Sequence, residues 1–287
     1  MIDFARQPAV EVQAPSGSAA PSPLFLDSPH SGSTYPDDFG SILPLLRLRR
    51  AEDAFVDVLF GEAPKLGVTL IDAKFPRAYL DPNRDNTDFS PEDLADEWPG
   101  VLVPGKKAVN GTGLVWVRMH GLTEVYEQKL TSAALKHRID HCWTPYHAAV
   151  SNAFDDLHRS FGCVYHMNCH SMRSMGNVKD PDGPTARPDF VLSDRDGTTC
   201  EPGFTQAAKD YLEKEGFSVQ VNFPMKGVEL VRRYSDPASS RHSLQIEVNR
   251  RHYMNEETIE KSENFEAFKA HLTALTSELA AYAKSKV

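Results

Sequence analysis

The stretch Ser-Phe-Gly-Cys-Val-Tyr-His-Met-Asn-Cys-His-Ser-Met at residues 160–172 joins a predicted helix to a predicted strand. A long helical region precedes it from about 130 to 161, with a bend expected at Pro145, and Gly162 ends that helix. Residues 163–170 are typical of a strand, which leads into a polar loop at 172–188. A helix that runs almost directly into an apolar strand is typical of α/β architecture.

The same alternation continues in both directions along the chain. Strands are predicted at 24–26, 68–75, 113–119, 189–193, 217–223 and 243–248, and further helices at about 45–66, 202–214 and 265–282. We therefore predict one α/β domain over residues 1–287, with a mixed, largely parallel central sheet flanked by helices. Residues 1–22 form a leader segment, and the long polar loop at 85–112 is expected to belong to an active site.

The composition excludes several classes of protein. The net charge of −9 argues against a nucleic-acid partner. No apolar run is long enough to cross a membrane, and no signal peptide is visible, so neither a membrane partner nor export is expected. The four cysteines show no CxxC pairing, which favours reduced thiols in a cytoplasmic protein.

Two histidines lie where predicted strands end. His30 follows the strand at 24–26 and His170 ends the strand at 163–170, while residues 77–84 follow a third strand. Ligands of α/β sheets bind beyond the carboxyl ends of the strands, and zinc in hydrolases takes histidine and carboxylate ligands with one position open. The carboxylates near the first histidine are Asp27, Asp37, Asp38, Glu52, Asp53 and Asp57.

Five motifs in a fixed order resemble the N-formylglutamate amidohydrolases, which are related to zinc carboxypeptidases and aspartoacylase. The motifs are Ser-Pro-His-Ser-Gly (28–32), Ala-Glu-Asp-Ala-Phe-Val-Asp (51–57), Phe-Pro-Arg-Ala-Tyr-Leu-Asp-Pro-Asn-Arg (75–84), Asn-Cys-His-Ser-Met (168–172) and Leu-Gln-Ile-Glu-Val-Asn-Arg (244–250) with Tyr-Met (253–254). They extend over about residues 25–256. The resemblance implies a carboxypeptidase-like fold and one zinc ion.

The resemblance also implies the metal ligands. His30 and His170 are the implied imidazole ligands. The carboxypeptidase relatives take a carboxylate three residues after the first histidine, but Ser33 occupies that position here. Asp53, at the start of the amphipathic part of the next predicted helix, is the favoured third ligand, and Asp57 is the alternative.

Glu247 is implied as the general base. It interrupts an apolar strand, where a carboxylate is costly, and alternation places it on one face with Gln245 and Asn249. Burial is expected to raise its pKa toward the range useful for proton transfer. The alternative is a buried ion pair with an arginine such as Arg232 or Arg250.

Other residues are assigned to substrate. Asn83 and Arg84 resemble the pair that binds a substrate carboxylate, and Arg77 is implied to stabilise the oxyanion of the scissile carbonyl. Arg232 is expected either to bind a side-chain carboxylate or to belong to a solvated basic patch. Asn168 departs from the aspartate expected in the family, so a hydrogen bond to a metal ligand is expected to be weaker.

The function implied is zinc-dependent hydrolysis of N-formyl-L-glutamate to formate and L-glutamate, with a small acidic N-acyl amino acid as the partner. A second interpretation keeps the zinc chemistry and changes the substrate to another N-acyl amino acid or a peptide terminus. A third is a binding protein that has the fold without the metal.

Overall fold

The computed structural model describes residues 2–119 and 123–287, and these group into two compact units. The first unit comprises Met1–Glu11, Pro29–Ala54 and Asp72–Ala149, and the second comprises Val12–Ser28, Phe55–Ile71 and Val150–Val287. The prediction of one domain over residues 1–287 stays a prediction. No helix in the described part of the chain is long and apolar enough to cross a membrane.

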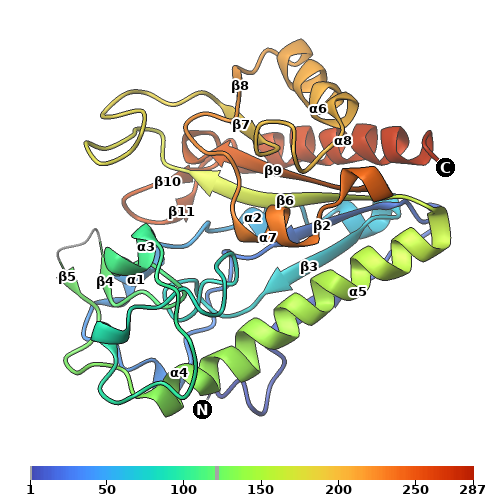
Figure 1. Cartoon of the computed structure of the whole chain (residues 1–287). Coiled ribbons are helices and arrows are strands. Elements are labelled where there is room, and N and C mark those ends of the chain that lie inside the picture. The colour runs from blue at the N-terminus through green and yellow to red at the C-terminus, as the bar shows by residue number, and fades with distance from the viewer. Residues whose placement is uncertain (1, 120–122) are drawn as a thin grey trace. The chain divides into compact units, whose positions relative to one another are not determined.

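A seven-stranded sheet is the framework of the second unit (Figure 1). Two of its strands, β1 and β3, also include residues of the first unit. Its order is β1 (Val10–Gln13), β3 (Thr69–Ala73), β2 (Leu24–Ser28), β6 (Val164–Met172), β9 (Arg241–Asn249), β7 (Phe190–Ser193) and β8 (Val219–Val221). The pairs β2–β6, β6–β9 and β7–β8 are parallel, whereas β7–β9 is antiparallel. The predicted mixed, largely parallel sheet flanked by helices is confirmed.

One face of this sheet packs against two helices, α6 (Pro202–Lys214) and α8 (Phe265–Lys284), which lie together in Figure 1. The ring of Tyr165 on β6 lies 4.9 Å from that of Phe204 on α6 and 5.9 Å from that of Tyr282 on α8. Because side chains alternate along a strand, the neighbours of Tyr165 in the chain project from the other face.

The other face packs against the end of α5 (Thr144–Phe161) and the short helix α7 (Glu229–Tyr234). The ring of His166 lies 5.3 Å from that of Phe154 on α5, which stacks on Tyr234 of α7. The even-numbered residues of β6, among them His170, therefore share this face.

Asp189 fixes the start of β7. Its carboxylate accepts hydrogen bonds from the backbone N–H and hydroxyl of Ser218, at 2.8 and 2.6 Å, and pairs with Arg251 and His252. Burial works against ionisation of this group, but these bonds lower the pKa of Asp189 well below its usual value.

The first unit is built mainly from short elements and turns. These are α1 (Leu45–Arg49), α3 (Lys106–Val109), β4 (Arg118–Met119), β5 (Thr123–Glu124) and α4 (Ser132–Arg138), with 3₁₀ turns at Asp37–Phe39 and Pro91–Asp93. Buried Arg138 ties them together, because its guanidinium donates to the carbonyls of Tyr79 and Phe39 and to the hydroxyl of Tyr126. A π-helical turn at Ile139–Trp143 then joins α4 to α5, just before Pro145. The predicted strand at 113–119 is reduced to Arg118–Met119.

The predicted helix at 45–66 is wrong. The structure has α1, then irregular chain, α2 (Val56–Leu59) and a 3₁₀ turn at Ala63–Leu66. Phe55 adopts a left-handed conformation with φ of 67°, which a continuous α-helix excludes. Asp53 therefore lies outside any helix, and the helix-dipole argument for its position does not apply.

The remaining short elements flank β9. A 3₁₀ turn at Pro237–Ser239 precedes this strand. A second 3₁₀ turn at Arg250–His252 follows it, and then the hairpin of β10 (Met254–Asn255) and β11 (Glu260–Lys261).

Candidate active site

His30 is the centre of a buried polar cluster in the first unit. Its Nε2 lies 2.7 Å from Oδ1 of Asp81, and its Nδ1 lies 3.3 Å from Oδ2 of Asp53. The backbone N–H of Asp53 donates to the carbonyl of His30 at 3.0 Å, which holds the two residues together although 23 positions separate them. Gly32 allows this path, because a Cβ there would lie 2.3 Å from the carbonyl oxygen of Phe75.

Asp81 organises this cluster. Its Oδ1 accepts from the backbone N–H of Asn83 as well as facing His30, and its Oδ2 accepts from Nη2 of Arg77 at 2.8 Å. Burial works to raise the pKa of Asp81, but His30, Arg77 and Arg84 together hold it well below its usual value. The carboxylate therefore stays ionised and can accept a hydrogen bond from Nε2–H of His30.

The loop that carries Asn83 and Arg84 is held by aromatic side chains. Trp143 Nε1 donates to the carbonyl of Arg84 at 2.9 Å, and His147 Nε2 donates to the carbonyl of Pro82 at 2.8 Å. The rings of Trp143 and His147 stack with centroids 3.7 Å apart. Asn83 is buried and Arg84 is half-buried, and Nε of Arg84 has no hydrogen-bond partner among the described residues.

In the second unit, His170 and Glu247 occupy partner positions on the parallel strands β6 and β9. Both project from the face that packs against α5 and α7, and both are buried. Nε2 of His170 donates to Oδ1 of Asn168 at 2.7 Å, and Nε2 of Gln245 donates to Oε1 of Glu247 at 2.8 Å. One sheet face therefore carries the predicted second imidazole ligand beside the predicted base.

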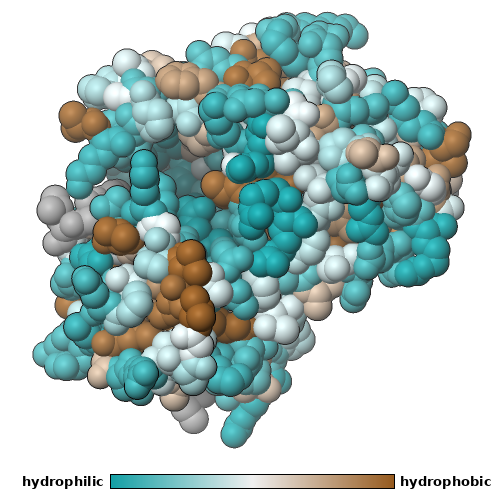
Figure 2. Space-filling model, viewed as in Figure 1, coloured by the Kyte–Doolittle hydropathy of each residue, from teal (hydrophilic) through white to brown (hydrophobic). Residues whose placement is uncertain are grey.

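Arg232 lies on α7, and its side chain is 54% exposed. It donates to the carboxylate of Glu229 on the same helix at 2.6 and 3.2 Å, and Arg233 binds that carboxylate too. The surface over α7 is hydrophilic in Figure 2. This setting matches a solvated helix face, one of the two interpretations of this residue.

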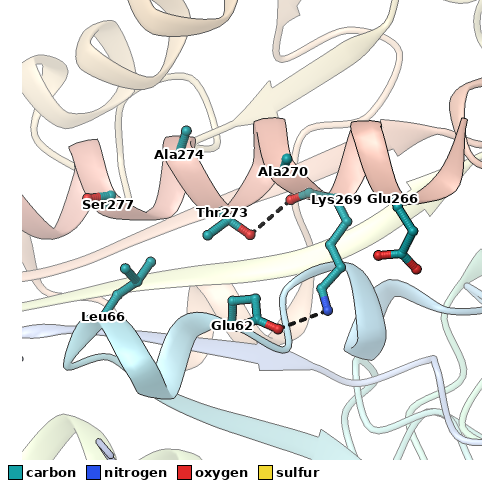
Figure 3. A pocket seen from close by; sticks show the side chains of 8 residues that line it. All are labelled: Glu62, Leu66, Glu266, Lys269, Ala270, Thr273, Ala274 and Ser277. Atoms are coloured by element: carbon teal, nitrogen blue, oxygen red, sulfur yellow. Dashed lines mark hydrogen bonds and ion pairs between the residues drawn. The ribbon is translucent and has the colours of Figure 1, made fainter. Parts of the chain in front are cut away.

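The surface groove drawn in Figure 3, of about 400 Å³, lies between the 3₁₀ turn at Ala63–Leu66 and α8. Lys269 crosses it to bind Glu62 at 3.0 Å. None of the residues that line it leaves a buried polar atom unpaired, and none was predicted to act in a site. The groove therefore does not compete with the clusters around His30 and His170.

The model of the N-formylglutamate amidohydrolase family matches residues 22–254. The chain belongs to this family. The match includes every residue predicted to bind metal, substrate or water, and the chain is an amidohydrolase.

Similar proteins are also named for N-formylglutamate. A solved structure titled N-formylglutamate amidohydrolase, from Ralstonia eutropha JMP134, is 42% identical with a TM-score of 0.93, over 97% of this chain and 99% of that one. The N-formylglutamate deformylase of Pseudomonas putida is 26% identical over 82% of each chain. That of Pseudomonas aeruginosa is 24% identical over 92% of this chain and 95% of the relative.

Two aspartates received no separate role from the sequence, although both belong to the buried clusters. Asp81 lies inside the amidohydrolase motif Asp-Pro-Asn-Arg, and its position four residues after Arg77 was the available signal. Asp27 was considered only as a candidate metal ligand. The structure places its fully buried carboxylate against His166 and Asn168. Asp57, the alternative third ligand, lies in the first turn of α2.

Proposed function

We propose that this amidohydrolase hydrolyses N-formyl-L-glutamate to formate and L-glutamate, using one zinc ion bound by His30, Asp53 and His170. The observation that carries the zinc proposal is the arrangement around His30. Asp81 accepts a hydrogen bond from Nε2–H of His30, and Nδ1 of His30 then faces a carboxylate oxygen of Asp53 with its lone pair. A histidine oriented by a carboxylate in this way is the usual form of a zinc ligand.

The donor set fits zinc. His30, Asp53 and His170 are all buried, and each offers one ligand atom. Asn168 is the partner of Nε2 of His170, so we assign metal binding to Nδ1. Two imidazoles and a carboxylate are a common ligand set of catalytic zinc, which leaves a further position open. Bound zinc would supply Lewis acidity at the scissile amide.

The protein's own groups supply the proton transfers. Glu247 takes a proton from the attacking water and passes it to the leaving nitrogen, which leaves as an amine. Gln245 donates a hydrogen bond to Oε1 of Glu247, which restrains the orientation of this carboxylate. Arg77 is assigned to the oxyanion that develops on the formyl oxygen.

The remaining groups bind glutamate. Asn83 and Arg84 are assigned to the α-carboxylate, which a guanidinium can bind through two hydrogen bonds. Arg232 is assigned to the side-chain carboxylate, at the expense of its bonds to Glu229. A cytoplasmic location stays a prediction. All four cysteines are buried and lie outside any disulfide.

The decisive experiment measures formate release from N-formyl-L-glutamate alongside a panel of other N-acyl amino acids and peptides. The purified chain should contain about one zinc ion per molecule, as one His-His-carboxylate site requires. Chelation should abolish turnover and added zinc should restore it. Full activity in a metal-free preparation would refute the zinc proposal, and a preference for another acyl group would refute the substrate.

Replacement of Glu247 by Gln tests the base separately. Turnover should fall by about 10²–10⁴-fold, the usual contribution of a general base, while zinc stays bound. Glu201→Gln is the control, because that carboxylate binds the hydroxyls of Tyr165 and Tyr282. Comparable turnover in the two variants would show that Glu247 is not the base.

A further inference from the structure

A chain of buried hydrogen bonds leads away from His170 through the sheet of the second unit. Oδ1 of Asp27 accepts from Nε2 of His166 at 2.8 Å and from Nδ2 of Asn168 at 2.7 Å. Oδ1 of Asn168 accepts from Nε2 of His170 at 2.7 Å, and the other end of the chain is the contact between His166 and Ser243 at 2.8 Å. All five side chains are at most 3% exposed.

The order of donors and acceptors is fixed from one end. Oδ1 of Asp27 faces Nε2 of His166 and accepts from Nδ2 of Asn168, so the amide NH₂ of Asn168 points toward Asp27. The amide oxygen must then face His170, and it can only accept. Nε2 of His170 therefore carries the proton, and Nδ1 carries the lone pair. Asp27 thus selects the tautomer of His170 through an intervening amide.

We propose that Asp27 and Asn168 are positioning residues that hold His170 ready to bind metal through Nδ1. The proposal rests on the zinc site proposed above. The asparagine transmits to this ligand the orienting effect of a buried carboxylate on the neighbouring strand β2.

This arrangement makes Asn168 hard to replace by aspartate. Asn168→Asp would bring two carboxylates into contact at the present distance of 2.7 Å, and like charges so close in a buried site repel strongly. Asn168→Ala removes both hydrogen bonds without adding charge. Asn168→Ala should release the ring of His170 from its tautomer, and Asn168→Asp should push the side chain at 168 away from Asp27 and so out of its position beside the ring.

The double variant Asp27→Asn with Asn168→Asp should restore the chain in reversed form. The new amide at position 27 would donate one hydrogen to the carboxylate at 168 and the other to Nε2 of His166. His166 can accept there if it moves its proton to Nδ1 and donates to Ser243. The carboxylate at 168 would again accept from His170, which keeps the same tautomer.

The experiment measures zinc affinity by competition with a chromogenic chelator, together with thermal unfolding of each variant without zinc. Asn168→Asp and Asn168→Ala should weaken zinc binding by about 10–100-fold, the usual effect of losing a partner of a metal-bound histidine. The double variant should recover most of that loss. The visible spectrum of the cobalt-substituted chain should change in the single variants and return in the double variant.

Asn222→Asp is the matched control. Asn222 donates to Asp194 at 2.7 Å in the same unit, so the change creates a similar contact between two carboxylates without touching His170. It should lower the unfolding temperature and leave zinc affinity unchanged.

The outcomes separate this inference from the zinc proposal. Failure of the unchanged chain to bind zinc would refute the zinc site and the positioning role with it. Zinc binding by the unchanged chain, with equal affinity in Asn168→Ala or no recovery in the double variant, would overturn the positioning role alone.

Discussion

Asp81→Asn should weaken zinc binding and catalysis together, because this carboxylate holds three parts of the cluster in the first unit. Oδ1 faces His30 and accepts from the N–H of Asn83, and Oδ2 accepts from Arg77. An asparagine of the same shape can keep its oxygen toward His30 and Asn83. Its NH₂ group then faces the guanidinium of Arg77, where donor meets donor and the bond is lost.

The magnitude follows from these contacts. One hydrogen bond to a charged group, worth about 2 kcal/mol, is lost from the stability of the zinc-free chain. The lost negative charge also makes His30 a weaker ligand, which should cost about 10–100-fold in zinc affinity. kcat/KM at limiting zinc should fall by a similar factor.

The assay compares zinc dissociation constants, urea unfolding of the zinc-free chain and formate release in wild type and variant. Asp93→Asn is the control, because it breaks an aspartate–arginine pair of the same unit, with Arg118 at 2.8 and 3.1 Å, without touching His30. If Asp81→Asn loses stability as this control does but keeps zinc affinity and turnover, Asp81 has only a structural role and the reasoning fails.

Four further changes test other parts of the molecule. Asp189→Asn should lower the free energy of unfolding at pH 7 by about 2 kcal/mol, since it weakens hydrogen bonds to a charged group. Its carboxyl pKa is depressed in the folded state, so the difference should begin to shrink as the pH falls below about 4 and should go on shrinking until the folded-state carboxyl is protonated. Gln245→Leu should lower kcat about 10-fold, because it removes a hydrogen bond that orients Glu247. KM should change little, because no residue assigned to substrate binding is altered. Arg84→Lys should raise KM about 10-fold or more, since an ammonium cannot bind a carboxylate through a planar fork. Arg232→Gln should raise KM for N-formylglutamate but not for N-formylalanine, which has no side-chain carboxylate.

The changes at positions 189 and 232 each have a specific contrary outcome. A stability difference at position 189 that does not shrink at all between about pH 5 and about pH 3 would show that the charge is not its cause. An unchanged KM for N-formylglutamate in the Arg232 variant would assign this residue to the solvated face of α7, where Glu229 already pairs with it.

Local sequence patterns were sufficient for much of the fold. The ends of β2 and β6 could be predicted to within two residues because apolar runs give way to polar residues there, and this change also marked His30 and His170. The mixed sheet followed from the alternation of helices and strands. These features depend on neighbours in the chain, which a single sequence displays.

The pattern failed between residues 45 and 66 for a physical reason. Apolar residues recur there at helical spacing, but the left-handed conformation of Phe55 interrupts the helix. Spacing reports which side chains face the core, and it does not report a backbone reversal that still buries them. Asp53 was named correctly as a neighbour of His30, although the contact comes from a backbone hydrogen bond and not from a helix.

The sequence by itself named the residues proposed to carry the chemistry, since histidine and arginine after predicted strands and a glutamate inside one are visible as types and positions. Only the tertiary structure decided which atoms of those residues meet which partners. Asp81 meets His30 across 51 positions, and Asp27 meets Asn168 across 141. Such contacts arise when distant segments pack and strands pair in register, and the proton on each imidazole follows from them.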